Sequence, residues 1–196
     1  MDFILAGFIE AIRLLFGGEA QTWSAVAATV KVSTGSMVTS LILGIPLGFV
    51  LGYFEFPAKR QARLIVDTAL ALPTVFVGLL VYAFISNQGP LGQMGMLFTL
   101  RGIAIGQTIL ALPIVVALSA TAVESMDRHL RTLLITLGAS RQQLLLTSLW
   151  EVRYGVLAAG LTAYGRVMTE VGVSMMVGGN IKWQTRTITT ALALET

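Results

Sequence analysis

The sequence has few charged residues and no cysteine. Only 12% of its 196 residues are Asp, Glu, Lys or Arg, whereas 55% are hydrophobic. A chain of this size that folded in water could not bury so much apolar surface in one core, so the composition favours a lipid bilayer as the solvent. The lack of cysteine excludes disulfides, thiolate metal sites and a cysteine nucleophile.

Sequence signatures of catalysis are also missing. There is no G-x-x-x-x-G-K-[ST] phosphate loop for ATP hydrolysis and no H-E-x-x-H pair for a zinc protease. The single histidine, His129, lies in an arginine-rich segment, where we expect a solvated side chain. The net charge is +3, but Lys and Arg are dispersed and form no basic stripe with aromatics. We therefore predict no enzyme active site, no metal or cofactor in this chain and no nucleic-acid partner.

Four apolar runs approach the ~20 residues that a helix needs to cross ~30 Å of hydrocarbon. They cover approximately residues 32–54, 64–85, 102–123 and 155–177. Pro46, Pro73 and Pro113 lie inside the first three runs, where neighbouring helices must satisfy the carbonyls that a proline leaves unpaired. Glycine recurs at every fourth position from Gly44 to Gly52, which allows a close helix contact. The sequence predicts an all-α polytopic membrane protein.

Both ends of the chain also carry apolar patterns. Residues 1–16, MDFILAGFIEAIRLLF, lack the positive leading region of a signal peptide and contain three charges. We expect an N-terminal amphipathic helix at the interface or against the bundle, with a short spanning helix as the alternative. After the fourth run, GGNIKWQTRTITTALALET turns apolar where the sequence stops. We expect about five spans with the last helix missing, or else a naturally short chain.

Basic residues in short loops predict the orientation. Lys59, Arg60 and Arg63 lie between the first two runs. The loop between the third and fourth runs contains four more arginines: Arg128, Arg131, Arg141 and Arg153. Because cytoplasmic loops are enriched in Lys and Arg, these two loops should be cytoplasmic and the N-terminus outside.

A helical hairpin is predicted at about residues 124–154, within a single domain that covers residues 1–196. Apolar residues of ESMDRHLRTLLITL fall on one side of a helix. Gly138 can supply the positive φ of a helix end, and Ser140 with Gln143 forms a capping-box pattern for the next helix. Such a hairpin either folds back on the bundle or offers an amphipathic helix to a partner.

The segment TLLITLGASRQQLLLTSLWEVRYGVLAAGLTAYGRVMTEVG resembles the cytoplasmic EAA loop and following helix of ABC-importer permeases, in particular the type I oxyanion permeases. LGIPLGFVLG, ALPTVFVGLLVY and GRVMTEVGVSMMVGGNIKWQTRTITTA resemble the same family, and WEVRYGVLAAGLTAYGRVMTEVGVSMMVGGNI is most similar to its tungstate branch. Gly138 matches the glycine of the loop, but Thr132, Leu133 and Leu134 stand where EAA is usual. The proline of the later Leu-Pro element is absent.

The resemblance implies a type I permease fold and a permease that moves a tetrahedral oxyanion, with tungstate first and molybdate or sulfate as alternatives. It implies a homodimer in the inner membrane of a prokaryote, with two cytoplasmic ABC ATPase subunits that bind ATP and Mg, and an extracytoplasmic oxyanion-binding protein. The hairpin would be the helix that docks on the ATPase. The residues carried over to this contact are Thr132, Leu133, Leu134, Gly138, Ala139, Ser140 and Arg141. A secondary transporter driven by an ion gradient is a second alternative.

Charged and hydroxyl-bearing residues in the runs are the candidates for the translocation pathway. Arg166 and Glu170 are four residues apart on the predicted fourth helix, so they either form a structural pair or balance the charge of a passing anion. Ser33, Thr34 and Ser36 make one half of the first run suitable for weak anion contacts or for helix packing. Asn180, which follows the fourth run, is a further candidate.

Overall fold

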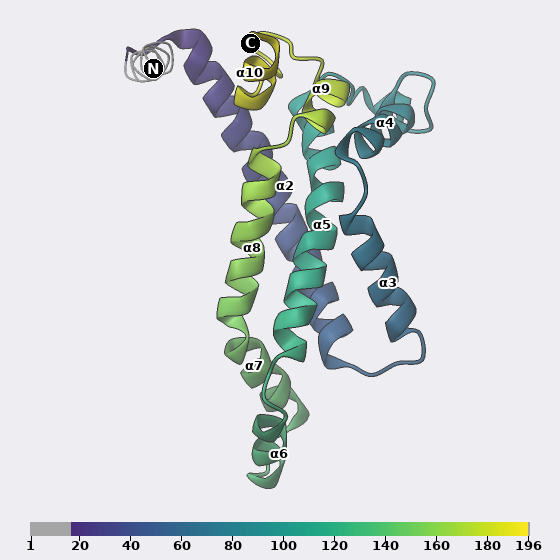
Figure 1. Cartoon of the computed structure of the whole chain (residues 1–196), viewed down its shortest axis with the longest axis vertical. Helices are drawn as coiled ribbons and strands as arrows, with labels where there is room; N and C mark the ends of the chain where they lie inside the picture. Colours follow the sequence, from purple (N-terminus) through teal and green to yellow (C-terminus); the bar gives the residue numbers. More distant parts are fainter. Residues whose placement is uncertain (1–16, 196) are drawn as a thin grey trace, which may run out of the picture. The chain divides into compact units, whose positions relative to one another are not determined.

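The computed structural model describes residues 17–195, apart from the side chains of residues 128, 131 and 195. Over this range the chain is helical, with one short 3-10 helix and no strand (Figure 1). Helices α2 (Ala20–Tyr53) and α5 (Leu100–Glu124) are each long and apolar enough to cross a bilayer, and up to four spans result if two bent helix pairs count as one each. The predicted all-α membrane architecture is confirmed. The amphipathic helix expected in residues 1–16 lies outside the described residues.

The second apolar run, residues 64–85, is two helices, so the proline inside it causes a full break. Helix α3 (Lys59–Leu70) ends before Pro73 and α4 (Thr74–Ile85) begins after it. Proline has no N–H and disfavours the helical conformation at the preceding Leu72, so two constraints act together at this point. In contrast, Pro113 lies inside α5, which covers the predicted third run. Helix α2 also keeps its proline but begins at residue 20 instead of 32.

The fourth run is also broken, so a single helix over residues 155–177 is wrong. Helix α8 (Arg153–Met168) ends within the run, and α9 (Gly172–Gly178) is a separate short helix. The new start has a local cause, because the backbone N–H of Val173 donates to Oε1 of Glu170 at 3.1 Å. A side-chain acceptor of this kind satisfies one of the free donors at a helix start. A last helix, α10 (Ile188–Glu195), follows.

The chain forms two compact units. Among the described residues, the first contains residues 17–35, 74–107 and 168–195. In this unit α4 packs on α9, and the 3-10 helix η1 (Gly92–Met94) follows α4. The second unit contains residues 36–73 and 108–167. Its core has two clusters, one around Met37, Val115 and Ala163 and one around Leu51, Val116 and Ala120.

A glycine seam brings α2 and α5 close together within the second unit. A Cβ on Gly48 would lie 2.7 Å from the carbonyl oxygen of Val116, and one on Gly52 would lie 2.6 Å from that of Ala120. Real Cβ atoms do not come this close to backbone oxygens, so only glycine permits the contact. The close approach expected from the four-residue spacing of Gly44, Gly48 and Gly52 is confirmed.

Candidate functional site

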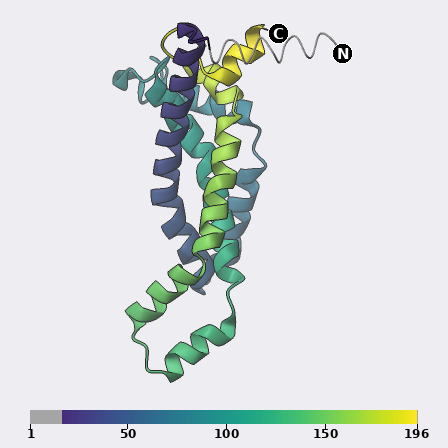
Figure 2. The same cartoon turned by 90° about the vertical axis from the view of Figure 1, so that its left-hand side faces the viewer.

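The predicted helical hairpin is present, and its two helices are α6 (Arg128–Thr136) and α7 (Arg141–Glu151). Figure 2 shows them beyond the ends of α5 and α8, the two helices to which they connect. Asp127 caps α6, because its side chain accepts the N–H of His129 at 2.8 Å. The helix pair is therefore an element of defined structure.

The joint of the hairpin is stabilised by hydrogen bonds between neighbouring residues. Gly138 has φ +80°, a conformation that glycine adopts without strain. The N–H of Gly138 donates to the carbonyl of Ile135 and that of Ala139 to the carbonyl of Leu134, which is the Schellman pattern of a helix end. Ser140 and Gln143 then exchange two hydrogen bonds, of 2.8 and 3.4 Å, so the predicted capping box is confirmed.

The seven predicted ATPase-contact residues surround this joint. Five are exposed, and Leu134 and Ala139 are half-buried, so the whole set is not one outward surface. Leu133 and Leu137 are 56% and 75% exposed, although both are large apolar residues. Leu137 is absent from the predicted set because the family motif does not include its position. Its exposure at the tip of α6 makes it an additional contact candidate.

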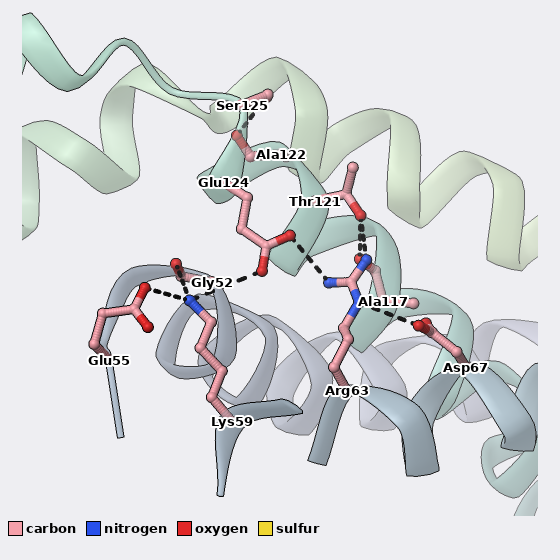
Figure 3. Close-up of polar contacts among 10 residues, drawn as sticks. All are labelled: Gly52, Glu55, Lys59, Arg63, Asp67, Ala117, Thr121, Ala122, Glu124 and Ser125. Atoms are coloured by element: carbon pink, nitrogen blue, oxygen red, sulfur yellow. Dashed lines mark hydrogen bonds and ion pairs between the residues drawn. The ribbon is translucent and has the colours of Figure 1, made fainter. Parts of the chain in front are cut away.

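A cluster of charged side chains lies at the end of α5 from which the hairpin begins (Figure 3). Glu124 is the last residue of α5, and its Oε1 lies 3.9 Å from Nζ of Lys59 on α3. Its Oε2 lies 3.5 Å from Nη1 of Arg63, also on α3. Lys59 makes a second ion pair with Glu55 at 2.9 Å, and Arg63 a second one with Asp67 at 3.5 Å.

An open cavity of about 790 Å³ adjoins this cluster. Lys59 and Glu124 line it together with Thr132 of α6, one of the predicted contact residues. In the sequence, Lys59 and Arg63 indicate a cytoplasmic loop, and no pattern singles out Glu124. Residues so distant in the sequence carry no periodic signal that would pair them.

The hydroxyl groups predicted for the pathway are divided between buried and exposed positions. Ser33 and Ser36 on α2 are fully buried, whereas Thr34 is exposed. The hydroxyl of Ser40 donates to the carbonyl of Ser36 at 2.8 Å, and that of Thr108 lies 3.4 Å from the same oxygen. The Thr108 contact joins α5 to α2 through the backbone carbonyl of Ser36. The burial of Ser33 and Ser36 fits helix packing better than contact with a passing anion.

Arg166 and Glu170 do not share a helix, which corrects the geometry assumed for them. Arg166 is exposed near the end of α8, whereas Glu170 is buried in the break before α9. The backbone carbonyl of Glu170 accepts hydrogen bonds from the hydroxyls of Thr189 at 3.0 Å and Ser174 at 3.3 Å. Glu170 is thus built into the start of α9. Its predicted part in anion passage stays a prediction.

Asn180 lies in the loop that follows α9. Its φ is +50°, in the left-handed region that asparagine tolerates better than most residues. Within the described chain, its buried Oδ1 has no hydrogen-bond partner. The next residues are held by Thr185, whose Oγ1 accepts the N–H of Ile181 at 3.1 Å. Asn180 stays a pathway candidate with an unused acceptor.

No group of three or more His, Asp or Glu side chains that could hold a metal ion occurs in residues 17–195. The features of this part of the chain that can act in function are the exposed hairpin and the polar residues within apolar helices.

Comparison with known proteins identifies the family. The model of a family described as "Binding-protein-dependent transport system inner membrane component" matches residues 44–191, more than half of the chain. The chain is 49% identical to the tungstate uptake system permease protein of Campylobacter jejuni, over 100% of this chain and 82% of the relative. It is 32% identical to the tungstate uptake system permease protein of Peptoclostridium acidaminophilum, over 99% and 85%. It is 28% identical to the molybdenum transport system permease protein of Escherichia coli, over 87% and 78%. The chain therefore belongs to the family of inner membrane components of binding-protein-dependent transport systems, as its sequence resemblance indicated.

Proposed function

We propose that the chain is the permease subunit of an ATP-driven importer that moves tungstate into the cytoplasm. The observation that carries this proposal is the 49% identity to a tungstate uptake permease along the whole chain. The identity to a molybdenum permease is much lower, at 28%. The apolar helices provide the membrane part, and the capped hairpin provides a surface for a soluble partner.

The partners follow from the same proposal. Two ATPase subunits bind ATP and Mg, and each docks on one hairpin of a permease homodimer. An external binding protein captures the anion and delivers it, because a pathway needs weak and multiple contacts for conduction. The orientation places the N-terminus outside and the hairpin, with Lys59 and Arg63 nearby, in the cytoplasm.

The exposed polar residues are the better candidates for anion contact. Arg166 offers positive charge and Thr34 a hydroxyl, and both are exposed in the described chain. Glu170 and Ser36 are buried and support helix starts and helix packing. Transport at the wild-type rate by an Arg166→Gln protein with normal expression would remove Arg166 from the pathway.

The test is tungstate-dependent ATP hydrolysis and uptake by the complex of permease, ATPase and binding protein in proteoliposomes. Gly138→Asp should abolish both activities, because a side chain at φ +80° disturbs the joint and adds a charge to the docking surface. Gly95→Asp is a matched control, since Gly95 also has positive φ and open space but lies outside the hairpin. Activity of the Gly138→Asp complex equal to that of the control would contradict the docking role.

A competition experiment tests whether tungstate, rather than molybdate or sulfate, is the preferred substrate. All three candidate anions are tetrahedral dianions, so uptake of tungstate is measured with molybdate or sulfate in excess. Tungstate uptake that persists supports the proposal, whereas complete competition by molybdate supports a shared oxyanion permease. Uptake that follows an ion gradient without any ATPase would favour the secondary transporter.

A further inference from the structure

Glu124 holds two cations of α3 at the point where α5 ends and the hairpin begins. The two ion-pair distances, 3.9 Å to Lys59 and 3.5 Å to Arg63, involve the two different oxygens of its carboxylate. Arg63 also donates from Nη2 to the hydroxyl of Thr121 on α5 at 2.6 Å, and Thr121 donates to the carbonyl of Ala117 (Figure 3). Through these contacts α3 is attached to the last turn of α5.

The pairs with Glu124 are the more shielded ones in the cluster. The side chains of Lys59 and Arg63 are 19% and 26% exposed, and that of Glu124 is 38% exposed. Glu55 is 87% exposed and Asp67 is 49% exposed. Water screens the outer pairs more strongly, whereas Lys59 lies closer to Glu55, at 2.9 Å, than to Glu124, at 3.9 Å.

Each cation pairs with a second acid besides Glu124. If Glu124 moves away, Lys59 keeps Glu55 and Arg63 keeps Asp67, both four residues away on the chain. Release of Glu124 therefore leaves neither cation unpaired, which reduces the penalty for breaking a shielded ion pair.

The cluster is next to the hairpin in space as well as in sequence. Only Ser125, Met126 and Asp127 separate Glu124 from the start of α6. The open cavity between Lys59, Glu124 and Thr132 leaves room for α6 to move relative to the cluster. From there α3 runs to the Leu72–Pro73 break, where the helical chain can change direction.

We propose that Glu124 is a positioning residue that transmits movement of the hairpin to α3 through alternate pairing with Lys59 and Arg63. This inference rests on the proposed function, because it needs an ATPase that moves the hairpin. In the structure all four ion pairs are formed together, and the proposed second arrangement keeps only the pairs with Glu55 and Asp67, because passing a conformational change between sites requires two discrete arrangements. Loss of the Glu124 charge should separate ATP hydrolysis from transport without removing the docking surface.

The experiment compares Glu124→Gln with Glu55→Gln in the reconstituted complex. Both changes remove one carboxylate next to Lys59, but only Glu124 links α3 to α5. We expect Glu124→Gln to keep ATP hydrolysis within about twofold of wild type and to reduce tungstate uptake per ATP by about fivefold or more. Glu55→Gln should change neither. Lys59→Gln and Glu124→Asp are measured as well. Glu124→Asp keeps a carboxylate and should retain part of the tungstate uptake per ATP.

The outcomes separate this inference from the proposed function. If tungstate uptake per ATP is the same in Glu124→Gln and wild type, the proposed role of Glu124 is wrong. It is also wrong if hydrolysis, uptake and thermal stability all fall in parallel. If Glu124→Gln does not fold, Lys59→Gln is measured instead, and an unchanged tungstate uptake per ATP in that variant also contradicts the role of Glu124. A wild-type complex with no tungstate-stimulated hydrolysis would instead contradict the proposed function itself.

Discussion

The α6–α7 hairpin and the region of α4, α9 and α10 are held together in different ways. In the hairpin, the caps at Asp127 and Ser140 and the joint at Gly138 are formed by residues a few positions apart. In the other region, the contacts join distant segments. The N–H of Ile188 donates to Oγ1 of Thr29 at 2.9 Å, and that of Phe98 to the carbonyl of Val177 at 2.9 Å.

The hairpin can therefore gain or lose a bound partner without unfolding, because its own bonds are local. The hairpin keeps its shape by local bonds and exposes Leu133 and Leu137, so a partner can cover or leave it. The α4–α9–α10 region buries its polar groups, including Glu170 and Thr190, and each needs its bonding partner in place. Substitutions in this region should reduce stability, whereas substitutions in the hairpin should reduce assembly.

The largest effect is expected from Gly78→Leu, which places a large side chain where α4 packs on α9. A Cβ at Gly78 would lie 3.3 Å from Cα of Val173 and 3.4 Å from the carbonyl oxygen of Gly172. A leucine would have to push the backbone of α9 away, with a loss of about 3 kcal/mol in unfolding free energy. Thermal unfolding in detergent measures this loss. Gly35→Leu, on α2 with open space around it, should leave the unfolding free energy unchanged. Equal losses in both variants would contradict the close packing of α4 on α9.

A smaller loss of stability is expected from Glu170→Ala. The change leaves the buried N–H of Val173 without its acceptor, which costs about 1–3 kcal/mol. Glu170→Gln keeps an oxygen at the same place and should retain most of the stability. If Glu170→Gln is stable but transports no tungstate, the charge itself is required and the pathway role is supported. Transport at the wild-type rate would leave Glu170 with a structural role only.

The comparison of the two regions also explains what the sequence could predict. The hairpin was predictable because its signals are local: an apolar helix face, a glycine and a capping box. The break between α3 and α4 has a visible proline, but only the structure shows a full break instead of a kink. The break before α9 has neither proline nor glycine within residues 169–171, so the apolar pattern continued through it.

The candidate site divides in the same way. The family motif and the local pattern pointed to Leu133, Gly138 and Ser140. In the structure these residues lie at the joint between α6 and α7. The cluster around Glu124 depends on pairs such as Arg63 with Thr121, which are 58 positions apart. No single sequence carries a signal for such a pair. Glu170 accepts a hydrogen bond from Val173, only three positions away, but the apolar pattern gave no sign of a new helix start there.

In the hairpin, Leu137→Ser should weaken assembly and leave stability unchanged. Leu137 is 75% exposed, so its removal leaves no cavity in the permease. If the ATPase covers it, the dissociation constant for the ATPase should rise about tenfold, or about 1.4 kcal/mol. Titration of the ATPase against the permease in nanodiscs measures this change. Leu91→Ser, outside the hairpin and also exposed, is the control, and equal affinities in both variants would place Leu137 outside the contact.

The smallest effect is expected from Ser140→Ala, which removes the capping box of α7. The side chain of Ser140 accepts the N–H of Gln143, and its loss should destabilise the start of α7 by about 1 kcal/mol. Hydrogen exchange at the first amides of α7 should then become about fivefold faster, while the global unfolding temperature stays the same. Ser125→Ala is the control, because the hydroxyl of Ser125 donates to the carbonyl of Ala122 and caps no helix start. A fall in unfolding temperature as large as that of Glu170→Ala would mean that the hairpin and the α4–α9–α10 region unfold together, since a purely local cap cannot change the stability of distant helices.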